Sequence, residues 1–113
     1  MEIQRVLDQA TFRDDKMAKV TLFETRNFFC DLYCLRPGQE QKVHSHAQND
    51  KIYYALRGSG RVTIGTETRD LREGEMVIAR AGLPHGIANS SAADLICLVF
   101  MAPHPRAIQL PDT

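Results

Sequence analysis

The chain has 113 residues, and its 14 Lys and Arg residues balance its 14 Asp and Glu residues. This length predicts a single domain that buries a core without needing disulfides. The neutral charge balance gives no electrostatic case for a nucleic-acid partner or an anionic membrane surface. The longest apolar run, residues 95–102, is far too short for a membrane-spanning helix.

The predicted elements are almost all short strands. Residues 3–10 have the spacing of a short N-terminal helix or turn. After them, runs of β-forming residues alternate with turn signals rich in Gly, Pro, Asn and Asp. The predicted strands cover residues 17–24, 28–35, 43–46, 52–56, 61–64, 68–71, 76–79, 85–88 and 95–101. This pattern is typical of an all-β sandwich or barrel of antiparallel strands.

We expect one domain over residues 1–113, with an N-terminal extension at 1–16, a core barrel at about 17–103 and a tail at 104–113. His104 lies between two prolines of that tail and is predicted to be exposed. The cysteines, Cys30, Cys34 and Cys97, form no CxxC pair and are predicted to be buried, reduced thiols. Since the N-terminus also lacks the order of a signal peptide, these features favour a cytoplasmic protein.

Three of the four histidines lie in two turn-rich segments. His44 and His46 are two residues apart, so on one strand they point to the same face. His85 lies in a later segment, within the sequence Gly-Leu-Pro-His-Gly. If a neighbouring strand carries His85, three imidazoles converge on one point, which is a donor set suited to a divalent transition metal.

The frames around these histidines resemble the two sequence motifs of the cupin superfamily. The first motif here comprises Gly38, His44, His46 and Gly58, with Lys51 at the position of the family's metal-binding glutamate. The second comprises Gly74, Gly82, His85 and Asn89, with Arg80 in place of a proline. The resemblance covers residues 37–103 and implies an all-β double-stranded β-helix, or jelly-roll, barrel. The motif glycines are expected at turns that need a positive φ or close backbone passage.

Lys51 is the departure from the family pattern. A protonated lysine has no lone pair for a metal and repels a divalent cation. Three arrangements are open: a metal held by three histidines with open positions for water or substrate, Asp50 or Gln48 as a weaker fourth ligand, or Lys51 in the place of the metal and bound to an anion. Lys51 and Tyr53 are two residues apart, so on one strand both side chains point to the same, inward face. Both are therefore predicted ligand-binding residues.

The resemblance implies a small single-domain cupin that binds Zn, Fe, Mn or Ni through its three histidines. It also implies a metal-dependent dioxygenase, isomerase or decarboxylase that acts on a small polar molecule. The alternative is a non-catalytic cupin that binds or senses a small ligand, with Lys51 holding an anionic ligand and no metal present. The expected partners are a small molecule and a second copy in a homodimer, with neither nucleic acid nor membrane.

Overall fold

A computed structural model describes residues 1–106 of the chain. Within this part, every pair of neighbouring strands runs antiparallel. The strands are β1 (Ala18–Glu24), β2 (Phe29–Leu35), β3 (Glu40–His44), β4 (Asp50–Arg57), β5 (Gly60–Ile64), β6 (Glu67–Leu71), β7 (Met76–Ala79), β8 (His85–Ala88) and β9 (Leu95–Ala102). The all-β prediction is confirmed. The strand predicted over residues 43–46 is shifted, since β3 begins at Glu40 and ends at His44.

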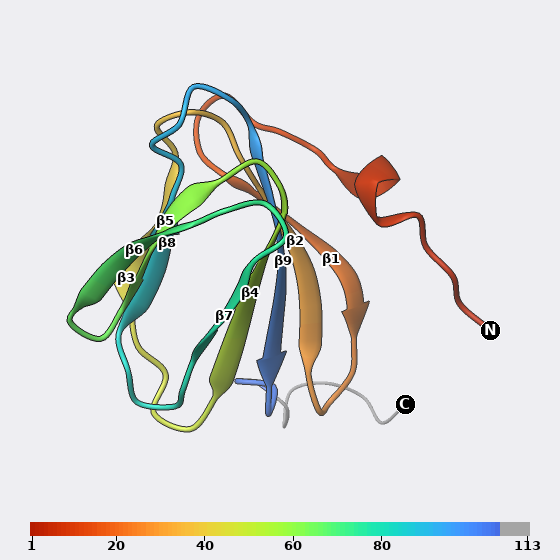
Figure 1. Ribbon diagram of the computed structural model, residues 1–113. Helices are drawn as coiled ribbons and strands as arrows, with labels where there is room; N and C mark the ends of the chain where they lie inside the picture. The colour runs from red at the N-terminus through yellow and green to blue at the C-terminus, as the bar shows by residue number, and fades with distance from the viewer. Residues whose placement is uncertain (107–113) are drawn as a thin grey trace.

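The strands form two sheets that face each other. One sheet has the order β1-β2-β9-β4-β7, and the other has the order β3-β8-β5-β6. Figure 1 shows the four-stranded sheet on the left and the five-stranded sheet beside it, with β7 at the edge nearest the β5–β6 hairpin. In both sheets, strands that are far apart in the sequence lie side by side. This arrangement is the double-stranded β-helix, or jelly roll, that the cupin resemblance implied.

The space between the sheets contains the main core. Its buried residues come from both sheets and include Tyr33, Tyr53, Val62, Ile87 and Val99. They alternate along their strands with residues of the outer faces, as a two-layer β-structure requires. A second apolar cluster lies on the outer face of the five-stranded sheet around Leu32 and Cys34.

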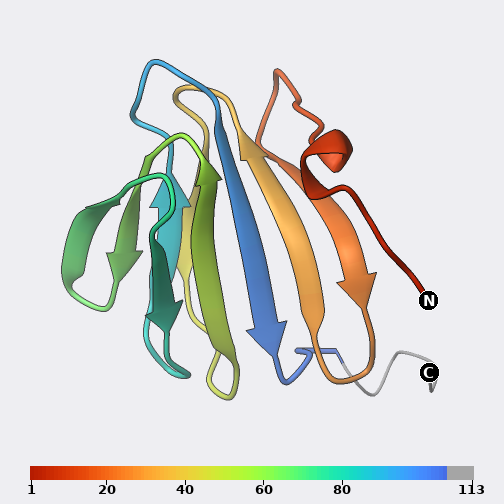
Figure 2. The same ribbon diagram turned by 45° about the vertical axis from the view of Figure 1, so that its right-hand side comes forward.

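The N-terminal segment covers part of that outer face. It contains a 3₁₀ helix, η1 (Val6–Gln9), and lies over the β1 side of the five-stranded sheet (Figure 2). Val6, Ala10 and Phe12 pack against the outer cluster. Among residues 1–106, we find no helix with the length and apolarity needed to cross a bilayer.

The structure corrects the prediction that His104 is exposed. Only 5% of this residue is accessible. Its Nε2 lies 2.7 Å from Glu24 Oε2, and its Nδ1 accepts a hydrogen bond from the Arg106 N–H. His104 therefore fastens the end of β9 to β1. Residues 107–113 of the predicted tail lie outside the described part of the chain.

The motif glycines have the predicted backbone role. Gly38, Gly58, Gly74 and Gly82 all have a positive φ, a conformation that residues with a Cβ rarely adopt. Gly82 shows the consequence for the site, since its N–H donates to the His46 carbonyl at 2.8 Å. This turn therefore ties the segment before His85 to the segment that carries His46.

Candidate metal centre

The structure brings His44, His46 and His85 together. One potential ligand atom from each residue lies within 4.8 Å of those of the other two. The ring centroids are 4.9 Å apart for His44 and His46, 4.6 Å for His44 and His85, and 5.6 Å for His46 and His85. His85 is buried and the other two are half-buried. The three side chains line one wall of the barrel, on the four-stranded sheet and just beyond the end of β3.

A β-bulge in β3 sets the direction of His44. His44 pairs with His85 and Gln41 pairs with Ile87, so three steps along β3 match two along β8. The extra residue lets Gln41 and His44 both face inward, although their spacing on a regular strand would place them on opposite faces. Gly86 lies so close to the bulge that a side chain would not fit. A Cβ at this position would lie 2.8 Å from the Gln41 carbonyl oxygen and 2.9 Å from the Val43 nitrogen.

Backbone carbonyls fix the orientation of two of the imidazoles. His44 Nδ1 lies 2.9 Å from the Lys42 oxygen, and His85 Nδ1 lies 3.0 Å from the Leu83 oxygen. A carbonyl oxygen only accepts, so Nδ1 donates its proton and a neutral ring keeps its lone pair on Nε2. Within residues 1–106, His85 Nε2 is buried and has no hydrogen-bond partner. A buried acceptor without a partner is costly, and a metal would satisfy it.

The protonation states of His85 and His46 also suit ligation. Burial lowers the pKa of His85 to about 4 and moves the pKa of His46 below its usual value. Both rings are therefore neutral at pH 7, which is the form that binds a metal. Two nitrogens on a tetrahedral zinc ion lie about 3.3 Å apart, given Zn–N bonds of about 2.0–2.1 Å. The ligand atoms of the three histidines lie within 4.8 Å of one another, which exceeds this spacing by at most about 1.5 Å, so the residues fit such a group.

The opposite wall of the barrel holds Lys51 in a polar network. Lys51 is 1% exposed, and its Nζ lies 3.3 Å from Gln41 Oε1. Tyr53 donates its hydroxyl proton to the same oxygen at 2.6 Å, and Gln41 Nε2 donates to the Tyr33 hydroxyl at 3.1 Å. The ammonium also lies 5.2 Å from the ring centroids of both tyrosines, within cation–π range. The predicted inward direction of Lys51 and Tyr53 agrees with this arrangement.

Burial lowers the pKa of Lys51 to about 7, and the nearby Lys19 ammonium adds to the effect. Burial raises the pKa of both Tyr33 and Tyr53, so their hydroxyls stay protonated. Lys51 is therefore poised between an ammonium and a free amine in the barrel interior. Either form can act on an oxygen atom of a ligand, as a charged donor or as a base.

The two residues considered as a fourth metal ligand lie elsewhere. Asp50 is exposed, and its Oδ1 accepts a hydrogen bond from the Ala81 N–H at 2.8 Å. Gln48 is also exposed, in the bend between β3 and β4. Neither belongs to the cluster that the three histidines form within the described residues.

Two polar residues that face the interior were not predicted from the sequence. Gln41 links the two sheets, and only the bulge in β3 turns it inward, so strand alternation could not reveal it. Asp31 could have been predicted as an inward-facing residue, because it lies two residues before Tyr33 on β2 and so points to the same face. Its Oδ1 is buried without a hydrogen-bond partner within the described part of the chain, and burial raises its pKa.

Comparison with known proteins agrees with the fold and the motif frames. The cupin-domain family model matches residues 31–101. Since this match covers more than half of the sequence, the chain belongs to the cupin family.

The chain is similar to proteins of nearly its own length. The crystal structure of TT1209 from Thermus thermophilus superposes with a TM-score of 0.90 at 45% identity, over 91% of this chain and 98% of that chain. An RmlC-like cupin from Desulfovibrio desulfuricans gives a TM-score of 0.80 at 27% identity, over 91% and 97% of the two chains. An uncharacterized protein of Streptomyces coelicolor is 30% identical over 86 residues, which is 76% of this chain and 81% of the relative.

Proposed function

We propose that this cupin binds one divalent transition metal ion through His44, His46 and His85. The observation that carries the proposal is the buried Nε2 of His85, which has no hydrogen-bond partner within residues 1–106 and belongs to a cluster of three imidazoles whose ligand atoms lie within 4.8 Å of one another. Three imidazole nitrogens, with no fourth protein ligand among the described residues, leave coordination positions for water or a substrate. Zinc, iron, manganese and nickel all bind such a donor set.

The proposed activity is metal-dependent chemistry on a small molecule, of the dioxygenase, isomerase or decarboxylase class. When bound, the metal would supply a Lewis acid that polarises an oxygen atom of the substrate. The chain supplies a second contact from the opposite wall, where the Lys51 ammonium can pair with a negatively charged oxygen. Tyr33 and Tyr53 exclude water around that ammonium, so the contact acts in a medium of low dielectric constant.

The test uses cobalt(II) as a spectroscopic stand-in and acetohydroxamate as a small chelating probe. We expect metal-free, tag-free protein to bind one equivalent of cobalt. We also expect acetohydroxamate to change the visible spectrum by entering the open positions. The His85→Ala variant should lose the cobalt spectrum. A spectrum that is present but insensitive to acetohydroxamate would show a closed structural site and would contradict the proposed activity.

A second candidate function is a metal-free binding site for a small anion, with Lys51 as its anchor. The specific observation in its favour is the burial of a lysine where the family has an acidic metal ligand. The Lys51 Nζ bonds one amide oxygen, so it keeps donors for a carboxylate or phosphate oxygen. In this case Nε2 of His44 and of His85 would accept hydrogen bonds from hydroxyl groups of the ligand, because their Nδ1 protons are donated to backbone carbonyls.

Chelation separates the two candidates. If the metal is required, affinity for an anionic probe such as oxalate should fall sharply after dialysis against a chelator. If Lys51 is the anchor, oxalate affinity should survive chelation and disappear in Lys51→Met. Turnover after metal is added to the metal-free protein then distinguishes an enzyme from a binding or sensing protein.

A further inference from the structure

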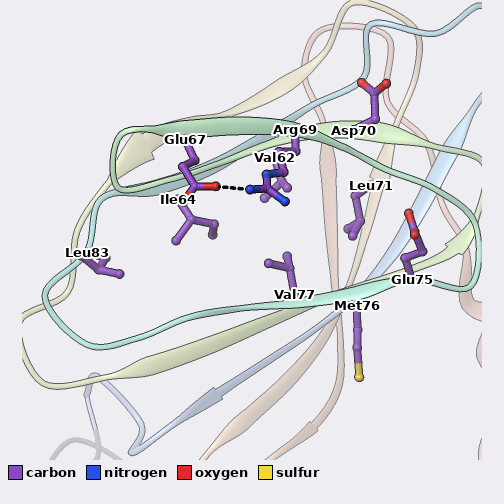
Figure 3. A pocket seen from close by; sticks show the side chains of 10 residues that line it. All are labelled: Val62, Ile64, Glu67, Arg69, Asp70, Leu71, Glu75, Met76, Val77 and Leu83. Atoms are coloured by element: carbon purple, nitrogen blue, oxygen red, sulfur yellow. Dashed lines mark ion pairs between the residues drawn. The ribbon is translucent and has the colours of Figure 1, made fainter.

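An apolar cleft opens at the side of the barrel where the β5–β6 hairpin faces β7. Its volume of about 440 Å³ lies within the range of small-molecule pockets, which is about 300–1,000 Å³. Figure 3 shows Ile64 and Val77 pointing toward each other across it, with Leu71 farther along the same cleft. Met76 borders the cleft but points away from it in the same view. Aliphatic side chains therefore line the inner part of the cleft, and the side chains of Glu67 and Arg69 lie on the same side of β6 as Leu71.

Charged side chains surround the mouth of this cleft. Glu67 and Arg69 form an ion pair at 2.8 Å, and their side chains are 66% and 79% exposed. Asp70 and Glu75 also line the cleft and are exposed. A protein partner that covered the mouth would have to desolvate these charges, whereas a small molecule in the cleft leaves them in water. The surroundings thus favour a small ligand over a second protein surface.

Two residues that line the cleft are direct strand partners of residues at the histidine site. Ile64 pairs with His85 across β5 and β8, and Val77 pairs with Tyr53 across β4 and β7. Directly opposed residues of antiparallel strands point to the same face, with Cβ atoms about 4.5–5.5 Å apart. Leu83, another lining residue, also provides the carbonyl that orients His85. The inner side of the cleft therefore lies one side chain away from His85 and Tyr53.

We propose that this cleft holds the apolar part of the ligand whose oxygen atoms bind at the histidine centre. The ligand class is a small amphipathic molecule with a chelating pair of oxygens at one end and a short aliphatic chain or single ring at the other. This inference rests on the proposed function, and it changes the expected substrate from a purely polar molecule to an amphipathic one. The cleft would select among chelating molecules by their apolar part. The metal ion held by the three histidines would bind their oxygen atoms.

The experiment compares two probes on the cobalt-loaded, full-length protein. Acetohydroxamate and octanohydroxamate carry the same chelating group and differ only in their aliphatic tail. Each buried methylene group is worth about a fourfold gain in affinity, so three buried groups give about 60-fold tighter binding. We expect a preference of this size for octanohydroxamate in a titration followed by the visible spectrum. Similar affinities for both probes would overturn the cleft assignment and leave the proposed metal site unaffected. Failure of acetohydroxamate itself to bind would overturn the proposed metal chemistry.

Adjacent residues of β7 supply a matched pair of variants. Val77→Phe fills the cleft and should reduce the preference to less than about fivefold while acetohydroxamate still binds. Ile78→Phe adds the same ring on the outer face of the strand and should leave the preference unchanged, because Ile78 pairs with Ile52 rather than Tyr53. Leu83→Ala, at a residue that is 41% exposed, provides a milder second test if Val77→Phe does not fold. If Val77→Phe instead converts a dimer into a monomer, the cleft is a subunit contact and the proposal is wrong.

Discussion

Replacement of Lys51 by methionine tests whether an ionisable group is buried in the barrel. Methionine has a similar length but no charge. The pKa of Lys51 is about 7 in the folded protein and about 10.5 when unfolded. Between these values the unfolded chain binds more protons, so this group makes the folded state more stable as the pH rises. Each pH unit within that window contributes about 1.4 kcal/mol.

The expected magnitude follows from this slope. Between pH 7 and pH 9, the free energy of unfolding of the wild type should rise by about 2 kcal/mol relative to Lys51→Met. The comparison has to be relative, because other groups act in the opposite direction in this range. Burial raises the pKa of Cys97 to about 12, so its unfolded thiol loses a proton first and alkaline pH destabilises the fold. The Lys51 charge opposes this rise in the pKa of Cys97, so its loss keeps the folded thiol protonated up to pH 9 and the Cys97 contribution is nearly the same in both proteins.

The assay is urea unfolding of metal-free protein at several pH values, followed by circular dichroism. An NMR titration of the lysine Cε resonances gives an independent check, since one lysine should titrate near pH 7 in the wild type and be missing from the variant. Parallel stability curves for the two proteins would refute the reasoning. They would mean that the Lys51 ammonium keeps its ordinary pKa and is solvated in the folded state.

Three further substitutions test the construction of the site. Gly86→Ala should lower the free energy of unfolding by about 1–3 kcal/mol and weaken cobalt binding, because its Cβ would collide with the bulge beside His44; unchanged cobalt affinity would contradict this. Asn89→Ala should cost about 3 kcal/mol in urea unfolding, since the buried amide donates to the Leu35 and Ala93 carbonyls and accepts from Ser91. Lys51→Glu should tighten metal binding at least about tenfold in competition with a chelator, by supplying the family's fourth ligand in place of a repulsive charge.

The sequence was sufficient for the main architecture because local signals agree with the fold. Strand periodicity and turn residues predict most of the strands, and the spaced glycines and histidines predict which barrel they form. The positive φ values of Gly38, Gly58, Gly74 and Gly82 are the physical basis of that spacing. The convergence of His44, His46 and His85 follows from the same frame.

Features that depend on irregular backbone or tertiary contacts were not predictable. The bulge before His44 changes which residues of β3 face the interior. Gln41 was therefore not recognised as the residue whose side chain contacts Lys51 and two tyrosines. His104 looked like an exposed tail residue, and only its contact with Glu24 across the sheet explains its burial. The apolar cleft likewise needs strands β6 and β7, which are not hydrogen-bonded neighbours, to be brought opposite each other.

The most direct measurement is the metal content of protein purified without a polyhistidine tag, determined by mass spectrometry for the wild type and for single histidine variants. We predict about one equivalent of a divalent transition metal in the wild type, and loss of that metal in His44→Ala, His46→Ala and His85→Ala. His104→Gln, at a histidine outside the cluster, should retain it. Metal content that does not change in His44→Ala and His85→Ala would contradict the three-histidine centre.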